Sequence, residues 1–283
     1  MRTYLNYTGT IAVTGVLATA LLIGCQSTEY PDPQPATGPS TNQARFLFVN
    51  AAPGAPALNF LVENNQAAQS VAYGQSSTGY TAAQAGTIQL RARAASGTIG
   101  GVLGNNDIVF RAGATNQTNF AASANTSYTV FVTDTLNRPR PTTSGATNQG
   151  GPQFLVVTDN LTAPTAGNAG VRFFHLAPDA PAVSVRLQPQ TTGQTAPTFL
   201  NRTYRTTSTG TGATAVNFAN FTSVPAGAYT VQVFTGATIP ATGNPVLSQT
   251  ITLEAGKLYT LFARGLVRGT GANALALGQV INN

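Results

Sequence analysis

Charged residues are scarce in this sequence of 283 residues. They make up 8% of it, against roughly 25% in typical soluble globular proteins, and Lys257 is the only lysine. Proteins that bind nucleic acid concentrate Lys and Arg into a stripe or run. The arginines here are scattered, with Arg91/Arg93 and Arg138/Arg140 as the close pairs. The net charge of +6 therefore does not predict a nucleic-acid partner, and we interpret these pairs as solvated positions of strands and loops.

Residues that carry catalytic or metal-binding chemistry are equally rare. Cysteine occurs once, at Cys25, and histidine once, at His175. The rest of the chain therefore has no disulfide, no thiolate metal site and no His-rich zinc site. A Ser-His-Asp triad would have to use His175, and no Gly-x-Ser-x-Gly elbow, phosphate-binding loop or EF-hand loop is present. We predict no enzyme activity, no metal and no cofactor.

The N-terminal segment indicates export. One charge, on Arg2, precedes an apolar run from Ile11 to Ile23, which has the length of a signal-peptide hydrophobic region and is short for a membrane span. The run ends in Leu22-Ile23-Gly24-Cys25, which resembles the lipobox of bacterial lipoproteins. The resemblance implies a signal peptide over residues 1–24 and lipidation of Cys25. Several acyl chains at one terminus would anchor the protein durably in a membrane.

The residues after Cys25 predict where the lipoprotein resides. Position 26 is Gln, so the inner-membrane retention signal with Asp at that position is missing, and we expect an outer-membrane lipoprotein. Residues 27–32 resemble the acidic surface-export signals of some bacterial lipoproteins, which favours exposure at the cell surface. Closely spaced prolines indicate that residues 25–43 form a stiff, extended tether. A plain secretory signal is the alternative, and it is disfavoured because the only cysteine lies where a lipobox requires it.

Four blocks of the remaining chain occur twice in the same order, which indicates an internal duplication. Pro53 in the first copy matches Pro178 in the second, and Tyr128 matches Tyr259. The blocks alternate apolar and polar residues and are separated by Gly, Pro and Asn, a pattern typical of antiparallel sandwiches or barrels. We predict an all-β protein with two tandem antiparallel β-sandwich domains, residues 44–163 and 169–283. The matched blocks are 45–57 with 172–182, 86–92 with 227–233, 127–131 with 258–262 and 154–157 with 274–277.

A turn rich in proline follows the first predicted strand of each copy. Proline fixes φ and lacks an N–H donor, so these prolines must lie outside a sheet ladder. We expect them to carry the chain across to the second sheet, with Asp179 capping the turn through backbone N–H groups. His175 is interpreted as a hydrogen-bonded strand-end residue that steadies this turn. The turn motif comprises Pro53, Pro56, Pro178, Asp179 and Pro181.

Three segments of the second copy, 174–185, 224–231 and 253–260, look like the domain of unknown function family 4397. The resemblance implies an immunoglobulin-like or transthyretin-like sandwich of a kind common in secreted and lipid-anchored bacterial proteins. It implies no activity. The first copy departs from the pattern, with Asn50 in place of the His and Gly54 in place of the Asp.

Exposed aromatic side chains are the usual sugar-binding platform of sandwich modules, and Trp is absent here. Tyr73, Tyr80 and Tyr204 lie in Ser/Thr/Gly-rich surroundings and are, with His175, the candidate ligand contacts. Asp134-Thr135-Leu136 resembles a short bacterial O-glycosylation motif, which makes Thr135 a candidate acceptor. The tyrosines expected in the core instead are Tyr128, Tyr229 and Tyr259.

These features predict a lipid-anchored, non-enzymatic cell-envelope protein that displays two modules for adhesion, scaffolding or spacing. The expected partners are the membrane, through the N-terminal lipid, and a surface glycan or envelope protein. The alternative is a carbohydrate-binding accessory lipoprotein, which requires an aromatic cluster on one exposed face. A third reading, a hydrolase, requires His175 and a carboxylate in one cleft.

Overall fold

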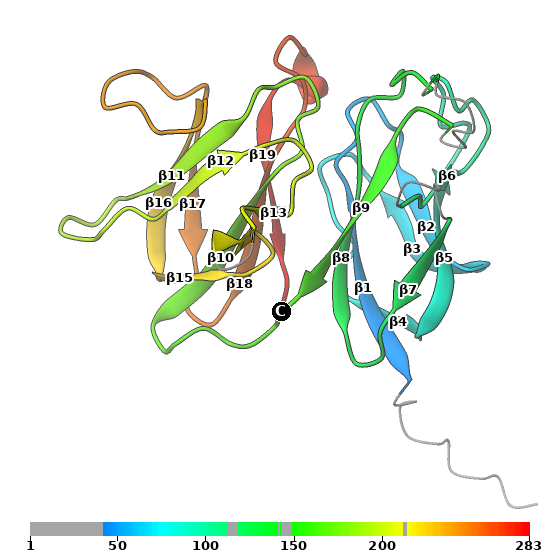
Figure 1. The fold of residues 1–283 in the computed structure, drawn as a ribbon, viewed down its shortest axis with the longest axis horizontal. Coiled ribbons are helices and arrows are strands. Elements are labelled where there is room, and N and C mark those ends of the chain that lie inside the picture. The colour runs from blue at the N-terminus through cyan, green and yellow to red at the C-terminus, as the bar shows by residue number, and fades with distance from the viewer. Residues whose placement is uncertain (1–41, 113–117, 141, 143–148, 212–213) are drawn as a thin grey trace, which may run out of the picture. The chain divides into compact units, whose positions relative to one another are not determined.

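The structure is a computed structural model that describes residues 42–112, 118–140, 142, 149–211 and 214–283. The predicted signal peptide (1–24), the lipobox residues Leu22, Ile23 and Gly24, the lipidation site Cys25 and nearly all of the tether lie outside the described residues. The described chain is all β apart from a short 3₁₀ turn, η2 (Gly271–Asn273), and it forms two halves (Figure 1). None of its helices has the length and apolar character needed to cross a bilayer.

The first half consists of two sheets that enclose one hydrophobic core. One sheet has the strand order β4-β1-β8-β9 and the other β3-β2-β5-β6, with β7 also paired to β5. The Phe48 and Phe60 rings, one from each sheet, stack with centroids 4.9 Å apart, and both side chains are fully buried. The strands are β1 (Gln43–Asn50), β2 (Leu58–Val62), β3 (Asn65–Val71), β4 (Thr81–Gln84), β5 (Gly86–Ala94), β6 (Ile108–Val109), β7 (Asn119–Ala122), β8 (Ser127–Thr133) and β9 (Gln153–Asp159).

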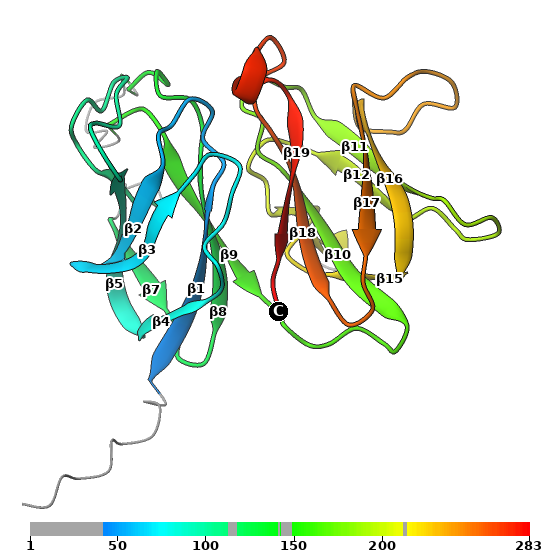
Figure 2. The ribbon, with the colours of Figure 1, turned by 180° about the vertical axis from the view of Figure 1, so that it is seen from behind.

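The second half has the same arrangement of two sheets, ordered β15-β10-β18-β19 and β12-β11-β16-β17, with a small β13-β14 hairpin in addition. Figure 2 shows both halves from the other side. Tyr229 and Tyr259 are buried in this core, as Tyr128 is in the first, which confirms their predicted placement. The strands are β10 (Asn168–His175), β11 (Val183–Pro189), β12 (Thr198–Arg202), β13 (Ser208–Thr209), β14 (Val216–Asn217), β15 (Thr222–Pro225), β16 (Gly227–Thr235), β17 (Leu247–Leu253), β18 (Leu258–Arg264) and β19 (Ala276–Ile281).

Strand register relates the two halves residue by residue. Phe46 is opposite Tyr128 in the first half, and Val171 is opposite Tyr259 in the second. Matching Tyr128 with Tyr259 therefore holds in the register. The expected match of Phe154 with Ala274 is wrong, because Phe154 pairs with Val132 and its counterpart Leu277 pairs with Ala263. The η2 turn occupies the residues just before β19, so this strand begins later in the sequence than the expected match with Ala274 required.

Each half contains one parallel pair of strands, so the expectation of purely antiparallel sheets is wrong. β1 runs parallel to β8, and β10 runs parallel to β18. The reason lies in the proline turn, because Pro53 and Pro56 prevent β1 from folding back as a hairpin. The chain passes to the other sheet instead and begins β2 at Leu58. A strand from much later in the sequence then fills the place beside β1.

Candidate functional site at the surface between the two halves

The sheets β4-β1-β8-β9 and β15-β10-β18-β19 bury the faces that point away from their own cores. Successive side chains of a strand point to opposite faces. In β8, Val130 and Val132 belong to the first core, whereas Phe131 belongs to a third apolar cluster that draws on both halves. The Phe131 ring centroid lies 5.9 Å from that of Phe174 and 5.6 Å from that of Phe262. We call this cluster, together with the polar groups beside it, the inter-half surface.

The inter-half surface is built from equivalent positions of the two halves. Phe131 of β8 corresponds to Phe262 of β18, and their opposite neighbours are Val49 and Phe174. Such self-complementary contact between like surfaces is the arrangement found in two-fold symmetric dimers. Gly278, opposite Phe262 in the second half, leaves room for the Phe262 ring, since a Cβ there would overlap it. The apolar members are Leu47, Val49, Ala51, Phe131, Val157, Phe174, Leu176, Phe218, Ala219, Phe262 and Val280.

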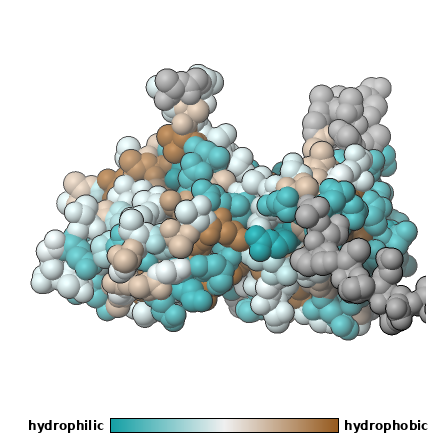
Figure 3. Space-filling view, turned by 90° about the horizontal axis from the view of Figure 1, so that it is seen from below, coloured by the Kyte–Doolittle hydropathy of each residue, from teal (hydrophilic) through white to brown (hydrophobic). Residues whose placement is uncertain are grey.

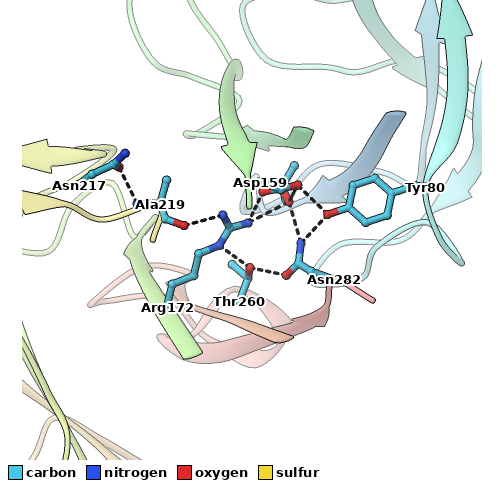
Figure 4. Close-up of polar contacts among 8 residues, drawn as sticks. Tyr80, Asp159, Arg172, Asn217, Ala219, Thr260 and Asn282 are labelled. Carbon is cyan, nitrogen blue, oxygen red and sulfur yellow. Dashed lines mark hydrogen bonds and ion pairs between the residues drawn. The ribbon is translucent and has the colours of Figure 1, made fainter. Parts of the chain in front are cut away.

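A buried arginine occupies the polar part of the surface (Figure 4). Arg172 of β10 is fully buried, and its Nη2 lies 2.6 Å from Oδ1 of Asp159, at the end of β9. Its other N–H groups donate to the Thr260 hydroxyl (2.8 Å), the Thr129 hydroxyl (3.0 Å) and the Ala219 carbonyl (3.1 Å). A buried ion pair is stable only when further hydrogen bonds satisfy both partners, and here they do.

Tyr80 and Asn282 complete the network on the carboxylate side. The Tyr80 hydroxyl donates to Oδ2 of Asp159 (2.6 Å) and accepts from Nδ2 of Asn282 (2.9 Å). Burial, followed by the nearby Asp159 charge, raises the pKa of Tyr80 well above its ordinary value, so the phenol remains a donor. Thr260 donates to Oδ1 of Asn282 (2.6 Å), as Thr129 donates to Oδ2 of Asp159 (2.8 Å). The network therefore closes on itself across the two halves.

The symmetry of the network is broken at one pair of positions. Arg172 is opposite Thr260, and the residue opposite the equivalent Thr129 is Leu47. Asp159 and Asn282 are likewise equivalent. Asp159 pairs with Ser127, and the Asn282 N–H donates to the carbonyl of Leu258, the counterpart of Ser127. One half thus supplies the cation and the other the carboxylate, which gives a single neutral pair.

The three tyrosines predicted as ligand contacts all lie at this surface. Beside Tyr80, the Tyr73 ring lies under the Arg264 guanidinium at 4.8 Å, and the Tyr204 ring meets His175 edge-on at 6.2 Å. The three side chains are partly buried, and the hydroxyl oxygens of Tyr73 and Tyr204 are covered. They therefore do not form an exposed platform. Their Ser/Thr/Gly-rich surroundings suggested exposure, whereas contact with the other half covers them.

His175 is a strand-end residue that hydrogen-bonds the proline turn, in agreement with the interpretation from the sequence. Its Nε2 lies 3.0 Å from the Pro181 carbonyl, and its Nδ1 lies 3.3 Å from the Ala177 N–H. Asn50 makes the equivalent contacts in the first half, donating from Nδ2 to the Pro56 carbonyl at 3.0 Å. With 1% of its surface exposed, the His175 side chain has both ring nitrogens engaged and presents no open face to a ligand.

This equivalence predicts the outcome of His175→Asn. Burial lowers the pKa of His175, so below about pH 6.5 the unfolded chain binds more protons than the folded one and stability falls. The asparagine should keep the turn, as Asn50 does, and remove this part of the acid sensitivity, worth up to about 1.4 kcal/mol per pH unit. Urea unfolding of both proteins at pH 7.5 and pH 5 measures the difference. An equal loss of stability in both would contradict the role given to His175.

The remaining predicted site residues serve local structure. Asp179 accepts the Val267 N–H at 2.9 Å, a bond to a distant loop, so the prediction that it caps its own turn is wrong. Thr135 is partly buried, and its N–H donates to the Asp134 carboxylate at 2.8 Å. In the part of the chain that the structure describes, no three His, Cys, Asp or Glu side chains gather as a metal site would require.

Comparison with known proteins identifies the family. The profile described as Domain of unknown function (DUF4397) matches residues 44–186, slightly more than half of the chain. The chain belongs to the DUF4397 family. The DUF4397 match begins in β1, spans the first half and continues into β11, so it includes both β10 and the His175 turn.

Other comparisons add little. No curated protein matches the chain. The crystal structure of a leucine-rich repeat protein from Bacteroides thetaiotaomicron VPI-5482 is similar over 77% of this chain, with 11% identity and a TM-score of 0.19. The chain spans 25% of the length of that structure. A likeness of this degree says nothing about the fold or the function of this protein.

Proposed function

We propose that this protein is a non-enzymatic, lipid-anchored component of a bacterial cell envelope, and that its two halves form one rigid spacer or scaffold. The inter-half surface is the observation that carries the proposal. Two domains joined by a linker move relative to one another unless a large hydrophobic interface holds them. Here Phe131, Phe174 and Phe262 are at most 1% exposed, and the Arg172–Asp159 pair lies among the contacts. Such a unit holds a fixed distance between its anchor and whatever it displays.

The halves are proposed to be two immunoglobulin-like or transthyretin-like β-sandwiches, residues 44–163 and 169–283, with the second a further copy of the family domain. Shared strand order and register support this. So does a tyrosine bond like the tyrosine corner of immunoglobulin-type sandwiches. The Tyr128 hydroxyl accepts the Ser123 N–H (2.9 Å), and the Tyr259 hydroxyl accepts the Glu254 N–H (3.0 Å).

The anchor is proposed to be a lipid on Cys25 at the outer membrane, with the protein on the outer side of the cell. The lipobox-like segment 22–25 and the proline-rich stretch after it support this. The charge-poor surface fits a display role. On the face in Figure 3, apolar residues lie in small separate patches among polar ones.

Rigidity is tested by pulsed electron paramagnetic resonance between spin labels at Thr87 on β5 and Thr252 on β17. Both residues are exposed, one in each half. Each is changed to cysteine in a full chain that carries Cys25→Ser. We expect one narrow distance distribution, because the buried aromatic rings and the Arg172–Asp159 pair hold the halves in one arrangement.

The control for this measurement is a label pair at Leu200 and Thr252, which lie within the second half on the strands β12 and β17. The distribution between the halves should be as narrow as that of the control pair. A distribution that is much broader, or that has two peaks, would show a flexible tandem and rule out a rigid spacer.

Carbohydrate binding is a second candidate function, favoured by a groove along β3. Its volume of about 570 Å³ is in the range of small-molecule sites. Hydroxyl and amide side chains line much of it, including Gln69, Ser70, Ser77 and Thr78. Groups of this kind suit a neutral sugar. The aromatic cluster that the carbohydrate-binding alternative requires is not part of this groove, since Tyr80 alone contributes a ring.

A further inference from the structure

Arg202, the last residue of β12, is a buried cation with no counter-ion in the described part of the chain. The residue is 9% exposed, and its Nε is covered without a hydrogen-bond acceptor. Among the described residues, no carboxylate or carbonyl pairs with its guanidinium, in contrast to Arg172, whose three nitrogens all donate hydrogen bonds. A buried charge normally requires a partner. Burial alone lowers the pKa of Arg202 to about 10, since no neighbouring anion offsets the lost hydration.

Two aromatic rings make cation–π contacts with this guanidinium. Its carbon lies 3.4 Å from the Phe218 ring centroid and 5.7 Å from that of Phe199. Stacking on aromatic faces stabilises a guanidinium and leaves its N–H edge available for hydrogen bonds. The planar edge is then fixed in orientation before any ligand arrives, which lowers the entropy cost of binding.

The fold does not require an arginine at this position. Arg202 lies opposite Val183, and the equivalent pair in the first half is Val71 with Leu58. Val71 is 4% exposed and packs in the apolar core of the first half. Phe199, opposite Val185, likewise replaces Ala68, opposite Phe60. The second half thus has a cation and an aromatic ring where the first half has two small apolar residues.

Arg202 and both rings line a pocket of about 270 Å³. This volume is just below that of drug-sized ligand sites, so the pocket suits a small molecule or the end of a larger one. Asn217, Asn220 and Thr222 add uncharged hydrogen-bonding groups at the wall. Val216, which is 51% exposed, provides an apolar part of the rim. No acidic residue lines the pocket.

We propose that this pocket binds an acidic sugar through its singly charged oxyanion, a carboxylate or a sulfate ester. One guanidinium balances one negative charge, and its fork matches two oxygens of a planar carboxylate or of a sulfate. The amides and the hydroxyl at the wall complement sugar hydroxyl groups, and the exposed Val216 provides apolar surface for C–H groups. This binding activity goes beyond the proposed spacer role and does not depend on it.

The test is titration of the full chain, purified in detergent, with galacturonate, galactose 6-sulfate and neutral galactose, followed by calorimetry. At least one of the two charged sugars should bind with a dissociation constant in the millimolar range or below, whereas galactose should bind at least about tenfold more weakly. Nuclear magnetic resonance provides a second measurement in the unaltered protein. The Arg202 Nε–H resonance should shift with the bound charged sugar and not with galactose.

Arg202→Met keeps the packing of the stem and removes the charge, so charged-sugar binding should weaken at least about tenfold. Arg186→Met is the matched control, because Arg186 also stacks on an aromatic ring, Phe234 at 5.3 Å, but is bonded to Gln232 at 2.9 Å. The control should bind within about twofold of the original protein. Arg202→Lys keeps the charge without the fork and should give intermediate affinity.

The proposal is overturned if neither charged sugar binds, if galactose binds as well as they do, or if Arg202→Met binds like the original protein. Should Arg202→Met fail to fold, Arg202→Lys and the Nε–H shift decide the question. A lysine variant with unchanged affinity and an unshifted Nε–H resonance would also overturn it. A spacer that proved flexible would leave these outcomes unaffected, so the two proposals can fail separately.

Discussion

Asp159→Ala is expected to lower the free energy of unfolding by about 3–5 kcal/mol, because it leaves the Arg172 charge buried without a partner. Both side chains of this pair are fully buried, and the carboxylate also accepts the Tyr80 and Thr129 hydroxyls. The variant therefore leaves several buried donors unsatisfied at once. Urea unfolding, with the slope compared between variant and original protein, measures the loss.

Asp107→Ala is the control, since it removes the partner of Arg93 at a similar distance, 2.8 Å, on the surface. Exposed ion pairs contribute about 0–1 kcal/mol, so the control should change stability little. If Asp159→Ala cost no more stability than Asp107→Ala, the Arg172–Asp159 pair would not be buried between the halves.

The double variant Arg172→Leu with Asp159→Asn should recover most of the lost stability. Each substitution introduces the residue that the equivalent position of the other half already has, Leu47 for Arg172 and Asn282 for Asp159. Replacing a buried ion pair by well-packed neutral residues is often neutral or stabilising. Recovery would show that the charge pair selects the arrangement of the halves more than it adds to their stability.

Cys25→Ser is expected to abolish lipidation and release the protein from the membrane. Burial of acyl chains contributes about 0.8 kcal/mol per CH₂ group, so losing several chains removes nearly all of the membrane affinity. Metabolic labelling with a fatty-acid analogue and fractionation of the cells measure both effects.

Gly24→Ala keeps a small residue before Cys25 and should leave labelling nearly unchanged. A serine variant that still carried the fatty-acid label would refute the lipobox assignment. Urea unfolding of the released variant should match that of the original protein, because Cys25 lies before the β-sheet region. That result separates loss of the anchor from loss of the fold.

Much of the fold could be predicted because its determinants are local in the sequence. Pro53 and Pro178 cannot donate to a ladder, so they end the first strand of each half wherever the chain folds. Tyr128 and Tyr259 follow a turn and begin an alternating run, which places them in a strand with one buried face. Alternation also identified β5, β16 and β17. The lengths of the loops have no such signal, and the repeat pattern therefore places the counterpart of Phe154 at Ala274, three residues before Leu277.

The inter-half surface had a signal that alternation does not capture. Phe46, Leu47, Phe48 and Val49 are apolar in succession, and every one of them is buried. A continuous apolar run is typical of a strand buried on both faces. Read in this way, β1, β8, β10 and β18 indicate sheets that are covered outside as well as inside. The apolar run does not indicate which segment covers the outer faces of these sheets.

The sequence by itself determined the all-β class, the proline turns and the alternating strands that hold Tyr128, Tyr229 and Tyr259. Each of these depends on neighbouring residues, whose backbone preferences and spacing act locally. Only the tertiary structure decided that Tyr80 meets Asp159 and Asn282, and that Arg202 lies against Phe218 without an anion. Such partners are brought together by packing between segments far apart in the sequence. A single sequence does not indicate which of these segments pack together.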